Sequence, residues 1–237
     1  QPRASLQLRN AADRPHLLIL ERAAWSDQAT LAADVTALQI FRDLFANEAI
    51  RPGEQISVGS LTVLFTDLRG STRLYREIGD APAFGLVMSH FDVLKAAISE
   101  AGGAIVKNIG DAVMAVFRSP AAAVRATLAA QRRLAQPAGG LRPLLLKAGI
   151  HHGPCIAVNF NDRLDYFGST VNAASRLVEL SDGADVVVSA VVRSDPEVAA
   201  LLADPAEGLA ASMDETALKG FDAERFEIWR VRSQTAG

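Results

Sequence analysis

Two aspartates stand at positions from which both could hold divalent cations. Asp67 ends an apolar stretch in LTVLFTDLRGST (61–72), and Asp111 lies between two apolar stretches in IVKNIGDAVMAVF (105–117). Two neighbouring carboxylates can hold a pair of cations suited to driving an in-line attack on a phosphate. The motif order predicts that both turns lie at one edge of a sheet. The alternatives are a plain helix N-cap for Asp67 with Ser71 and an ordinary turn residue for Asp111.

The residues after Asp67 predict an anion-binding turn. Gly70 and Ser71 open a predicted helix, and backbone N–H groups at such a turn point outward and attract anions. A cation that binds both the acid and phosphate oxygens would explain a carboxylate beside this turn. We therefore expect phosphates near Gly70 and Ser71.

A third motif, RLDYFGSTVNAASRL (163–177), predicts a ribose or phosphate site. Asn172 and Arg176 are four residues apart and share one face of a predicted helix. An amide and a guanidinium on one stripe suit phosphate or ribose. Asp165, before the helix, could accept from an exocyclic amine. Lys107 could donate to a bound base, and the alternative is a lysine that extends from a strand into solvent. The alternative for the helix pair is a surface Asn and Arg.

Composition bounds the class of protein. The 237 residues suffice for one large domain or a domain plus an appendage, and 49% are hydrophobic, as in a globular protein. The formal net charge of −3 gives no reason to expect bulk attraction to nucleic acid or anionic membranes. The sequence contains no apolar run of about 18 residues, so it gives no indication of a membrane span. The first residues lack a signal-peptide pattern.

The single cysteine, Cys155, excludes an intrachain disulfide and suits a reducing cytoplasm. Its apolar neighbours favour a small buried strand residue over a catalytic thiol. His151 and His152 would point to opposite faces of a strand, which is poor geometry for one shared metal. The chain begins at Gln1 rather than methionine, which is consistent with a piece of a longer protein.

Hydrophobic periodicity predicts alternating strands and helices after residue 55. Helices are expected from 71 or 72, over 81–101, 120–135 and 169–181, and near 190–202. Strands are expected at 61–66, 104–108, 112–117, 185–188, 214–219 and 225–231, with a hairpin of 144–150 and 154–160 around Gly153–Pro154. This order predicts an α+β sandwich, a mostly antiparallel sheet with helices on one face.

The N-terminal region predicts one amphipathic helix. Leu31, Val35, Leu38, Phe41 and Phe45 recur at spacings of three and four, as on a single apolar stripe. We interpret 28–55 as a signalling or linker helix and 1–27 as an N-terminal segment, the remnant of an upstream regulatory domain. The helix could pack on its own domain, pair with a second copy, or carry a signal from upstream.

Together the motifs FTDLRGST, KNIGDAVMAVF and DYFGSTVNAASRL resemble the catalytic domain of class III nucleotide cyclases, over about residues 57–232. Residues 35–60 also look like the lead-in of a bacterial subgroup in which the cyclase domain follows a regulatory domain. The resemblance implies a ferredoxin-like core, here 56–232, that works as a head-to-tail homodimer with both active sites across the interface.

The resemblance also implies roles for particular residues. Asp67 and Asp111 would bind two Mg²⁺ or Mn²⁺ ions, Lys107 and Asp165 would recognise adenine, Asn172 would orient the ribose, and Arg176 would stabilise the transition state. Arg225 would hold the terminal phosphates, with Lys219 as a competitor. Phe167 stands where some members have tryptophan, and the stretch 149–168 is shorter than in many animal members.

These residues predict a cytoplasmic adenylate cyclase, a lyase that converts ATP to 3′,5′-cyclic AMP and pyrophosphate. Guanylate-specific members typically carry glutamate and cysteine in place of the lysine and aspartate. Two other functions stay open: guanylate cyclase, and a catalytically silent module for nucleotide sensing or dimerisation. The upstream signal and the downstream pathway cannot be predicted from the sequence.

Overall fold

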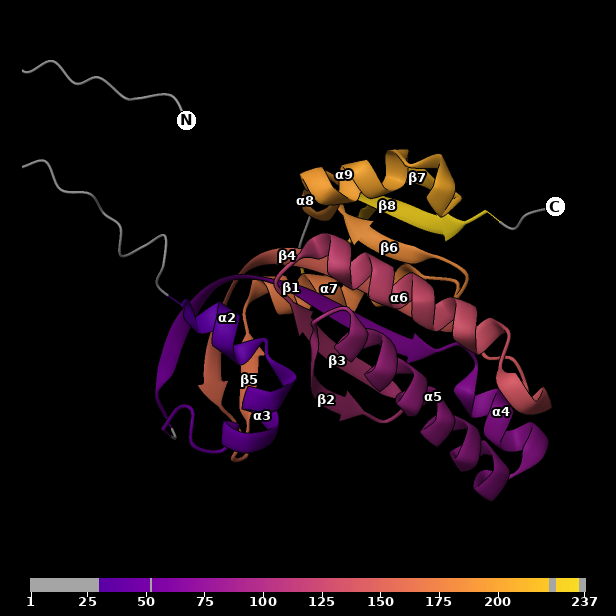
Figure 1. The fold of residues 1–237 in the computed structure, drawn as a ribbon, viewed down its shortest axis with the longest axis horizontal. Coiled ribbons are helices and arrows are strands. Elements are labelled where there is room, and N and C mark those ends of the chain that lie inside the picture. Colours follow the sequence, from indigo (N-terminus) through magenta and orange to yellow (C-terminus); the bar gives the residue numbers. More distant parts are fainter. Residues whose placement is uncertain (1–29, 52, 222–224, 235–237) are drawn as a thin grey trace, which may run out of the picture. The chain divides into compact units, whose positions relative to one another are not determined.

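The fold is built on one curved sheet, seen in a computed structural model that describes residues 30–51, 53–221 and 225–234. Its strands are β1 (Gln55–Leu68), β2 (Ala104–Ile109), β3 (Ala112–Phe117), β4 (Leu146–Asn159), β5 (Leu164–Phe167), β6 (Val186–Ser189), β7 (Leu209–Ala217) and β8 (Arg225–Ser233). The strand order is β2-β3-β1-β4-β6-β8-β7, with β5 paired to β4 (Figure 1). Of the pairings in the described part, only β4 with β6 is parallel, which confirms the predicted α+β class.

Helices connect the strands. They are α2 (Ala32–Thr36), α3 (Gln39–Phe45), α4 (Ser71–Ile78), α5 (Asp80–Glu100), α6 (Pro120–Ala135), α7 (Ser169–Leu180), α8 (Ala190–Arg193) and α9 (Pro196–Ala203), with short 3₁₀ turns at Ala138–Gly140 and Pro205–Glu207. Pro196 explains why α8 and α9 are separate rather than the single predicted helix 190–202, because proline cannot continue the preceding helix and favours a first turn. Asp195 caps α9 by accepting from the N–H groups of Glu197 and Val198.

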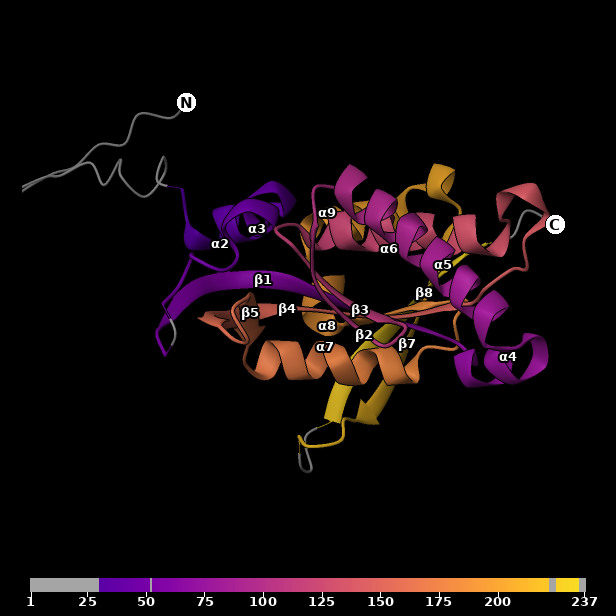
Figure 2. The same ribbon diagram turned by 90° about the horizontal axis from the view of Figure 1, so that it is seen from below.

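Helices cover both faces of the sheet, so the expectation of helices on one face is wrong. Alternate residues of β1 point to opposite sides, as a strand requires. Leu64 and Leu68 pack in the cluster that contains α5 and α6. Val63 and Phe65 pack in the cluster that contains Ala174 of α7. Figure 2 shows α5 and α6 on one side of the strands and α7 on the other.

The predicted hairpin at Gly153–Pro154 is also wrong, because β4 continues straight through these residues. Gly153 pairs with Leu61 of β1 and Pro154 with Ser60. Gly153 is needed for close packing rather than for a turn, since a Cβ there would lie 2.7 Å from Oγ1 of Thr170. That hydroxyl donates to the carbonyl of Pro154 at 2.6 Å, which ties the start of α7 to the middle of β4.

The predicted N-terminal helix is two short helices, α2 and α3, separated at Ala37–Leu38. The apolar stripe does not form the packed face, since Leu31, Leu38 and Phe45 are about half exposed. The buried residues are instead small or polar: Ala33, Thr36, Ala37 and Arg42. The segment packs on its own domain, against β1 and β2. The predicted segment 1–27 lies outside the described residues.

The long strands β1 and β4 form a curled ladder (Figures 1 and 2). Their register shifts between Ser57 and Gly59, and Gly59 has a left-handed φ of 77°. Such irregularities bend a strand and increase its twist. The curl carries β5, at the far end of β4, towards α2 and α3.

Helix α5 has the length and apolar composition of a membrane-crossing helix. It packs instead inside the domain. Val87, Leu94, Ala97 and Ile98 are buried in the cluster formed with α6 and the sheet, and His90 is fully buried. Core packing therefore explains the buried stripe of α5, about a third of its apolar window, while Phe84 and Met88 are exposed.

Candidate active site

Asp67 and Asp111 lie at the same edge of the sheet, as the motif order predicted. Asp67 is the penultimate residue of β1, and Asp111 is in the turn between β2 and β3. Val113 of β3 pairs with Thr66 of β1, so each aspartate lies within two residues of that pair. Two strand ends that are neighbours in the ladder thus deliver both carboxylates.

The electrostatics of this pair suit a bound cation. Burial raises the pKa of Asp67, and the charge of Asp111 raises it further, against a smaller lowering by Lys147. Oδ2 of Asp111 is buried and has no hydrogen-bond partner among the described residues. An unpaired buried carboxylate oxygen is costly, and a hard divalent cation is a suitable partner for it. The donor set therefore fits Mg²⁺ or Mn²⁺.

Two carboxylates alone do not complete the coordination sphere of such an ion. The described part of the chain contains no group of three or more His, Cys, Asp or Glu that could hold a metal. Mg²⁺ is usually bound through one or two carboxylates with water and substrate phosphates as its other ligands. The arrangement thus suits a cation that binds together with a phosphate substrate.

Ser71 shares a cleft with Asp111. Helix α4 begins at Ser71, directly after Gly70. The cleft, of about 470 Å³, is lined by Ser71, Thr72, Gly110 and Asp111 together with apolar side chains of α4 and α5. The structure thus brings the predicted anion-binding turn and one of the two acids to one cavity.

Lys107 and Asp165 form an ion pair. Nζ of Lys107 lies 2.5 Å from Oδ2 of Asp165, whose Oδ1 accepts from the N–H of Tyr166. Asp165 is buried, whereas the Lys107 side chain is 37% exposed. A polar cleft of about 670 Å³ borders Lys107 and includes Asn108 and Arg163. The pair therefore offers one donor and one acceptor side by side.

Asn172 and Arg176 lie on the outer side of α7. The buried side of the helix includes Ala174, Leu177 and Val178. Asn172 is exposed, and Arg176 donates to Oε1 of Glu179 at 2.8 Å, one turn further along the helix. An exposed ion pair of this kind is weak, so Arg176 can leave Glu179 and bind a phosphate at little cost in free energy.

Arg225 begins β8 and lies 3.5 Å from Glu215 of β7, while Lys219 is exposed after β7. The hairpin of β7 and β8 extends past the side of the sheet covered by α7 (Figure 2). Among the described residues neither side chain has a hydrogen bond or ion pair to Asp67, so the choice between Arg225 and Lys219 stays a prediction.

Asp165 and Asp67 lie at opposite ends of β1. Asp165 pairs with the end of β4 that pairs with Gln55 at the start of β1, whereas Asp67 is near the end of that strand. Lys107 lies nearer the acids, because it pairs with Met114 of β3, which pairs with Phe65 of β1. Asp165 is therefore remote from the acids along the sheet, and the Lys107 side chain bridges the gap between β2 and β5 to reach it.

Comparison with known proteins identifies the family. Residues 54–224 match the family described as the adenylate and guanylate cyclase catalytic domain. The chain belongs to this family. The resemblance and fold class inferred from the motifs are therefore confirmed.

Relatives with assigned names include cyclases. An adenylate cyclase of Anabaena cylindrica is 32% identical over 164 residues, which cover 60% of this chain and 33% of that protein. An uncharacterized Mycobacterium tuberculosis protein, Rv2212, is 34% identical over 161 residues, covering 67% and 38%. The chain thus spans little more than a third of the length of these curated relatives.

Solved structures share the fold. The adenylyl cyclase CyaB from P. aeruginosa superimposes with a TM-score of 0.63 at 26% identity, covering 75% of this chain and 95% of that one. The guanylyl cyclase Cya2 has the same TM-score at 21% identity, covering 76% and 94%. Because cyclases of both names share the architecture, the fold of this cyclase domain does not decide between ATP and GTP.

The surroundings of Cys155 and of the two adjacent histidines indicate structural roles in the cyclase domain. Burial raises the pKa of Cys155 to about 11, so its thiol stays protonated, as expected for a core strand residue. Nδ1 of His151 lies 2.8 Å from Oγ of Ser189, and Nδ1 of His152 lies 2.9 Å from Oγ1 of Thr62. The two rings thus have different partners.

The sequence interpretation missed two buried polar residues of the cyclase domain. His90 is fully buried in α5, without a side-chain hydrogen bond among the described residues. Arg42 is 6% exposed and donates to backbone carbonyls of three separate segments. The sequence signal for Arg42 was its charge within a predicted amphipathic helix, directly after Phe41.

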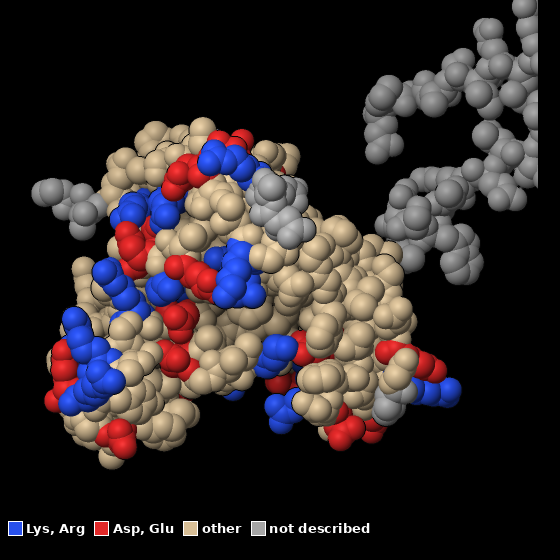
Figure 3. Space-filling model, turned by 180° about the vertical axis from the view of Figure 1, so that it is seen from behind, with Lys and Arg blue, Asp and Glu red and all other residues tan. Residues whose placement is uncertain are grey.

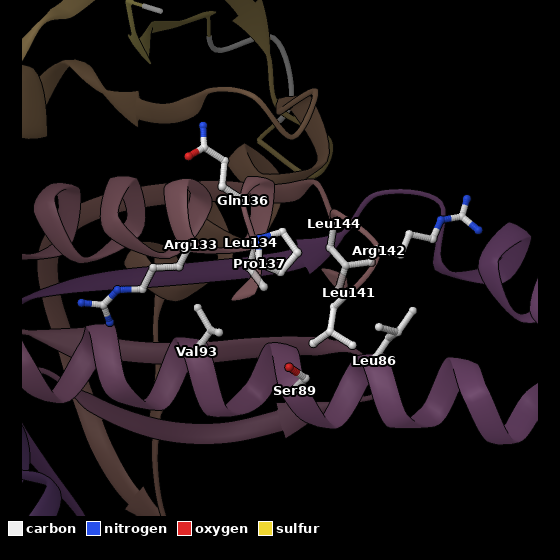
Figure 4. Close-up of a pocket in the computed structure, with 10 residues that line it drawn as sticks. All are labelled: Leu86, Ser89, Val93, Arg133, Leu134, Gln136, Pro137, Leu141, Arg142 and Leu144. Carbon is white, nitrogen blue, oxygen red and sulfur yellow. The ribbon is translucent and has the colours of Figure 1, made fainter. Parts of the chain in front are cut away.

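Two further surface features of the described part of the domain bear on function. A cavity of about 350 Å³ lies between α5 and the chain after α6, lined by Leu86, Val93, Leu141 and Leu144 among others (Figure 4). None of the predicted site residues lines it. On the face turned away from α5 and α6, positive and negative side chains are interspersed (Figure 3), without the uniform basic patch typical of nucleic-acid binding.

Proposed function

We propose that this domain is an adenylate cyclase that converts ATP to 3′,5′-cyclic AMP and pyrophosphate. The observation that carries the proposal is the Lys107–Asp165 pair, formed by a donor and an acceptor 2.5 Å apart beside a polar cleft. The family supplies the reaction class, and this pair supports the choice of base.

The pair matches adenine. The ammonium group of Lys107 can donate to ring N1, and the carboxylate of Asp165 can accept from the 6-amino group. Guanine presents the reverse pattern, an acceptor at O6 and a donor at N1. Each buried polar group left unpaired costs about 1–3 kcal/mol. Two mismatches would therefore discriminate against GTP on the order of a hundredfold.

Asp67 and Asp111 would hold two divalent cations, Mg²⁺ or Mn²⁺. When bound, such ions lower the pKa of the ribose 3′-hydroxyl and neutralise charge on the triphosphate. Two observations support this role: the pKa of Asp67 is raised, and Oδ2 of Asp111 has no hydrogen-bond partner among the described residues. Both indicate negative charge that a bound cation would neutralise.

The remaining residues position the reacting groups. Asn172 would hold the ribose so that O3′ is in line with the bond between the α-phosphorus and pyrophosphate. O3′ attacks the α-phosphorus and loses its proton, and the pyrophosphate oxygen leaves with the electron pair. Arg176 would leave Glu179 to stabilise charge on the α-phosphate. The N–H groups at Gly70 and Ser71, and Arg225, would hold the other phosphates.

A complete site would need two chains. Asp165 lies at the opposite end of β1 from Asp67, and a head-to-tail dimer would set the acids of one chain opposite Lys107 and Asp165 of the other. A two-fold dimer would then contain two such sites. The domain would act in the cytoplasm within a longer protein.

Product analysis tests the proposal. The chain would be incubated with Mn²⁺ and either ATP or GTP, and the products separated. We expect cyclic AMP and pyrophosphate from ATP, and none from a folded Asp67→Ala variant. Faster GTP turnover would favour guanylate cyclase. Turnover of neither nucleotide by a folded dimer would favour a silent nucleotide-sensing module.

A further inference from the structure

Arg42 of α3 is buried and bonded to backbone carbonyls. Its Nε donates to the carbonyl of Ile105 in β2 at 3.2 Å, and its Nη2 to the carbonyl of Leu164 in β5. Its Nη1 donates to Thr36 of α2 at 3.4 Å, and its guanidinium lies 5.4 Å from the centre of the Tyr166 ring. No acid lies within salt-bridge distance among the described residues. A buried charge is costly to keep, so its several carbonyl partners point to a geometric role.

The two strands that Arg42 joins are not neighbours in the sheet. From β2 to β5 the ladder passes through β3, β1 and β4. Backbone hydrogen bonds therefore do not set the gap between β2 and β5. Arg42 bonds to both strands directly, and its planar fork fixes the directions of its bonds.

The bonds lie next to the base-recognition residues. Ile105 is two residues before Lys107, and Leu164 is immediately before Asp165. The pairing of β2 with β3 shifts between Ile105 and Lys107, an irregularity that can redirect the following side chain. Gln39 of α3 supports the same point, since its Oε1 accepts from the N–H of Ile105 at 2.7 Å.

We propose that Arg42 is a positioning residue for purine recognition, which holds β2 and β5 at the spacing at which Lys107 and Asp165 can bind one base together. This inference rests on the proposed function of that pair. Because Arg42 belongs to the segment that leads into the catalytic domain, a movement of α3 would reach the base site directly.

Steady-state kinetics on the full chain test the role. In Arg42→Lys the charge remains and the fork is lost. We expect the KM for ATP to rise on the order of tenfold with a smaller change in kcat, since ground-state binding is weakened. The ratio of ATP to GTP turnover should fall as well. Gln39→Ala, which removes only the bond to Ile105, should shift both quantities in the same direction by less.

Arg118→Gln is the matched control. Nε of Arg118 lies 2.6 Å from Asp34, so the pair anchors α2 just after β3, and neither side chain has a hydrogen bond or ion pair to β2 or β5 in the described part of the chain. This variant should keep the parent KM and nucleotide ratio. Unchanged KM and ratio in Arg42→Lys and Gln39→Ala would overturn the proposal, as would an equal change in Arg118→Gln, which would indicate general loosening of the N-terminal segment.

A second measurement separates this inference from the proposed reaction. The thermal shifts produced by Mn²⁺–ATP and Mn²⁺–GTP would be measured on the same proteins. If the parent makes no cyclic nucleotide, the proposed function fails, yet a loss of ATP-over-GTP preference in Arg42→Lys still supports the positioning role. If the parent is active and the variant keeps the parent's binding preference, the positioning role alone fails.

Discussion

Nζ of Lys107 and Oδ2 of Asp165 lie 2.5 Å apart, although three strands separate β2 from β5 in the sheet. The two groups satisfy each other while no base is bound. A base must therefore supply both an acceptor and a donor to replace the bond that it breaks. The cost of opening this pair is the same for every purine, so discrimination depends on how well each base replaces the broken bond.

The base-recognition pair predicts a change of substrate. Replacing Lys107→Glu together with Asp165→Cys provides the groups typical of guanylate-specific relatives. ATP turnover should fall on the order of a hundredfold, because ring N1 and the 6-amino group of adenine lose their partners. GTP turnover should rise relative to the parent. Measuring kcat/KM for both nucleotides checks this, and a variant that still prefers ATP would contradict the assignment of the pair.

Asp67→Asn should separate fold stability from metal binding. The pKa of Asp67 is raised, so its ionised form is less favourable in the folded than in the unfolded chain and lowers stability at pH 7. In EDTA the variant should therefore melt at a higher temperature than the parent. Mn²⁺ should raise the melting temperature of the parent only, and cyclase activity should fall on the order of a thousandfold.

The control for Asp67→Asn is Glu48→Gln, at an exposed acid after α3. It should leave both the melting temperature in EDTA and the response to Mn²⁺ unchanged. Equal stabilisation of Asp67→Asn by Mn²⁺ would remove Asp67 from the metal site.

Two inactive chains should complement each other. Asp67→Ala and Arg176→Ala each disable both sites of their own homodimer. In a mixed dimer one site would carry both changes and the other neither. A 1:1 mixture with random pairing should therefore recover roughly a quarter of the parent activity. Absence of recovery, with mixed dimers demonstrated by mass spectrometry, would contradict the shared site.

His90 predicts acid sensitivity of the fold. Burial lowers its pKa to about 4, against about 6.5 in the unfolded chain. His90 is therefore neutral in the fold, and its contribution is intact above pH 6.5. As the pH falls from 6.5 to 4, the unfolded state gains a proton first, and stability drops by about 1.4 kcal/mol per pH unit, roughly 3 kcal/mol in all.

His90→Leu should flatten this dependence, because it removes the titrating group and two buried nitrogens without partners. Urea unfolding in EDTA between pH 7.5 and 4.5 measures the change. Some slope should remain, since burial also lowers the pKa values of His151 and His152. An identical slope in parent and variant would exclude His90 as a source of the acid sensitivity.

Elements with strong local signals were predictable. Helix α6 has the predicted bounds, and β3 was predicted from its apolar run VMAVF. The first half of β1 was missed because QISVGS is polar, and its exposed residues pair with the far half of β4. The far half of β4 was predicted as the second strand of a hairpin. Glycine is favoured both in a turn and where a strand packs closely, as Gly153 does against Thr170.

The placement of the candidate site residues was predictable where it depends on a single motif. Asp67, Asp111 and the outer stripe of α7 follow from spacing and strand order. The pairing of Lys107 with Asp165, 58 positions apart, was expected only through resemblance to the family. Arg42 could not be placed at all, because its partners meet only after the ladder of β1 and β4 has curled.

The displaced register at Ser57 and Gly59 has a consequence for engineering this enzyme class. It lies at the end of β1 remote from Asp67, yet it shapes the bend that delivers β5 to β2. Libraries confined to side chains that touch the nucleotide would leave this stretch untouched. Selection for a new purine preference should therefore also sample backbone curvature at Ser57 and Gly59.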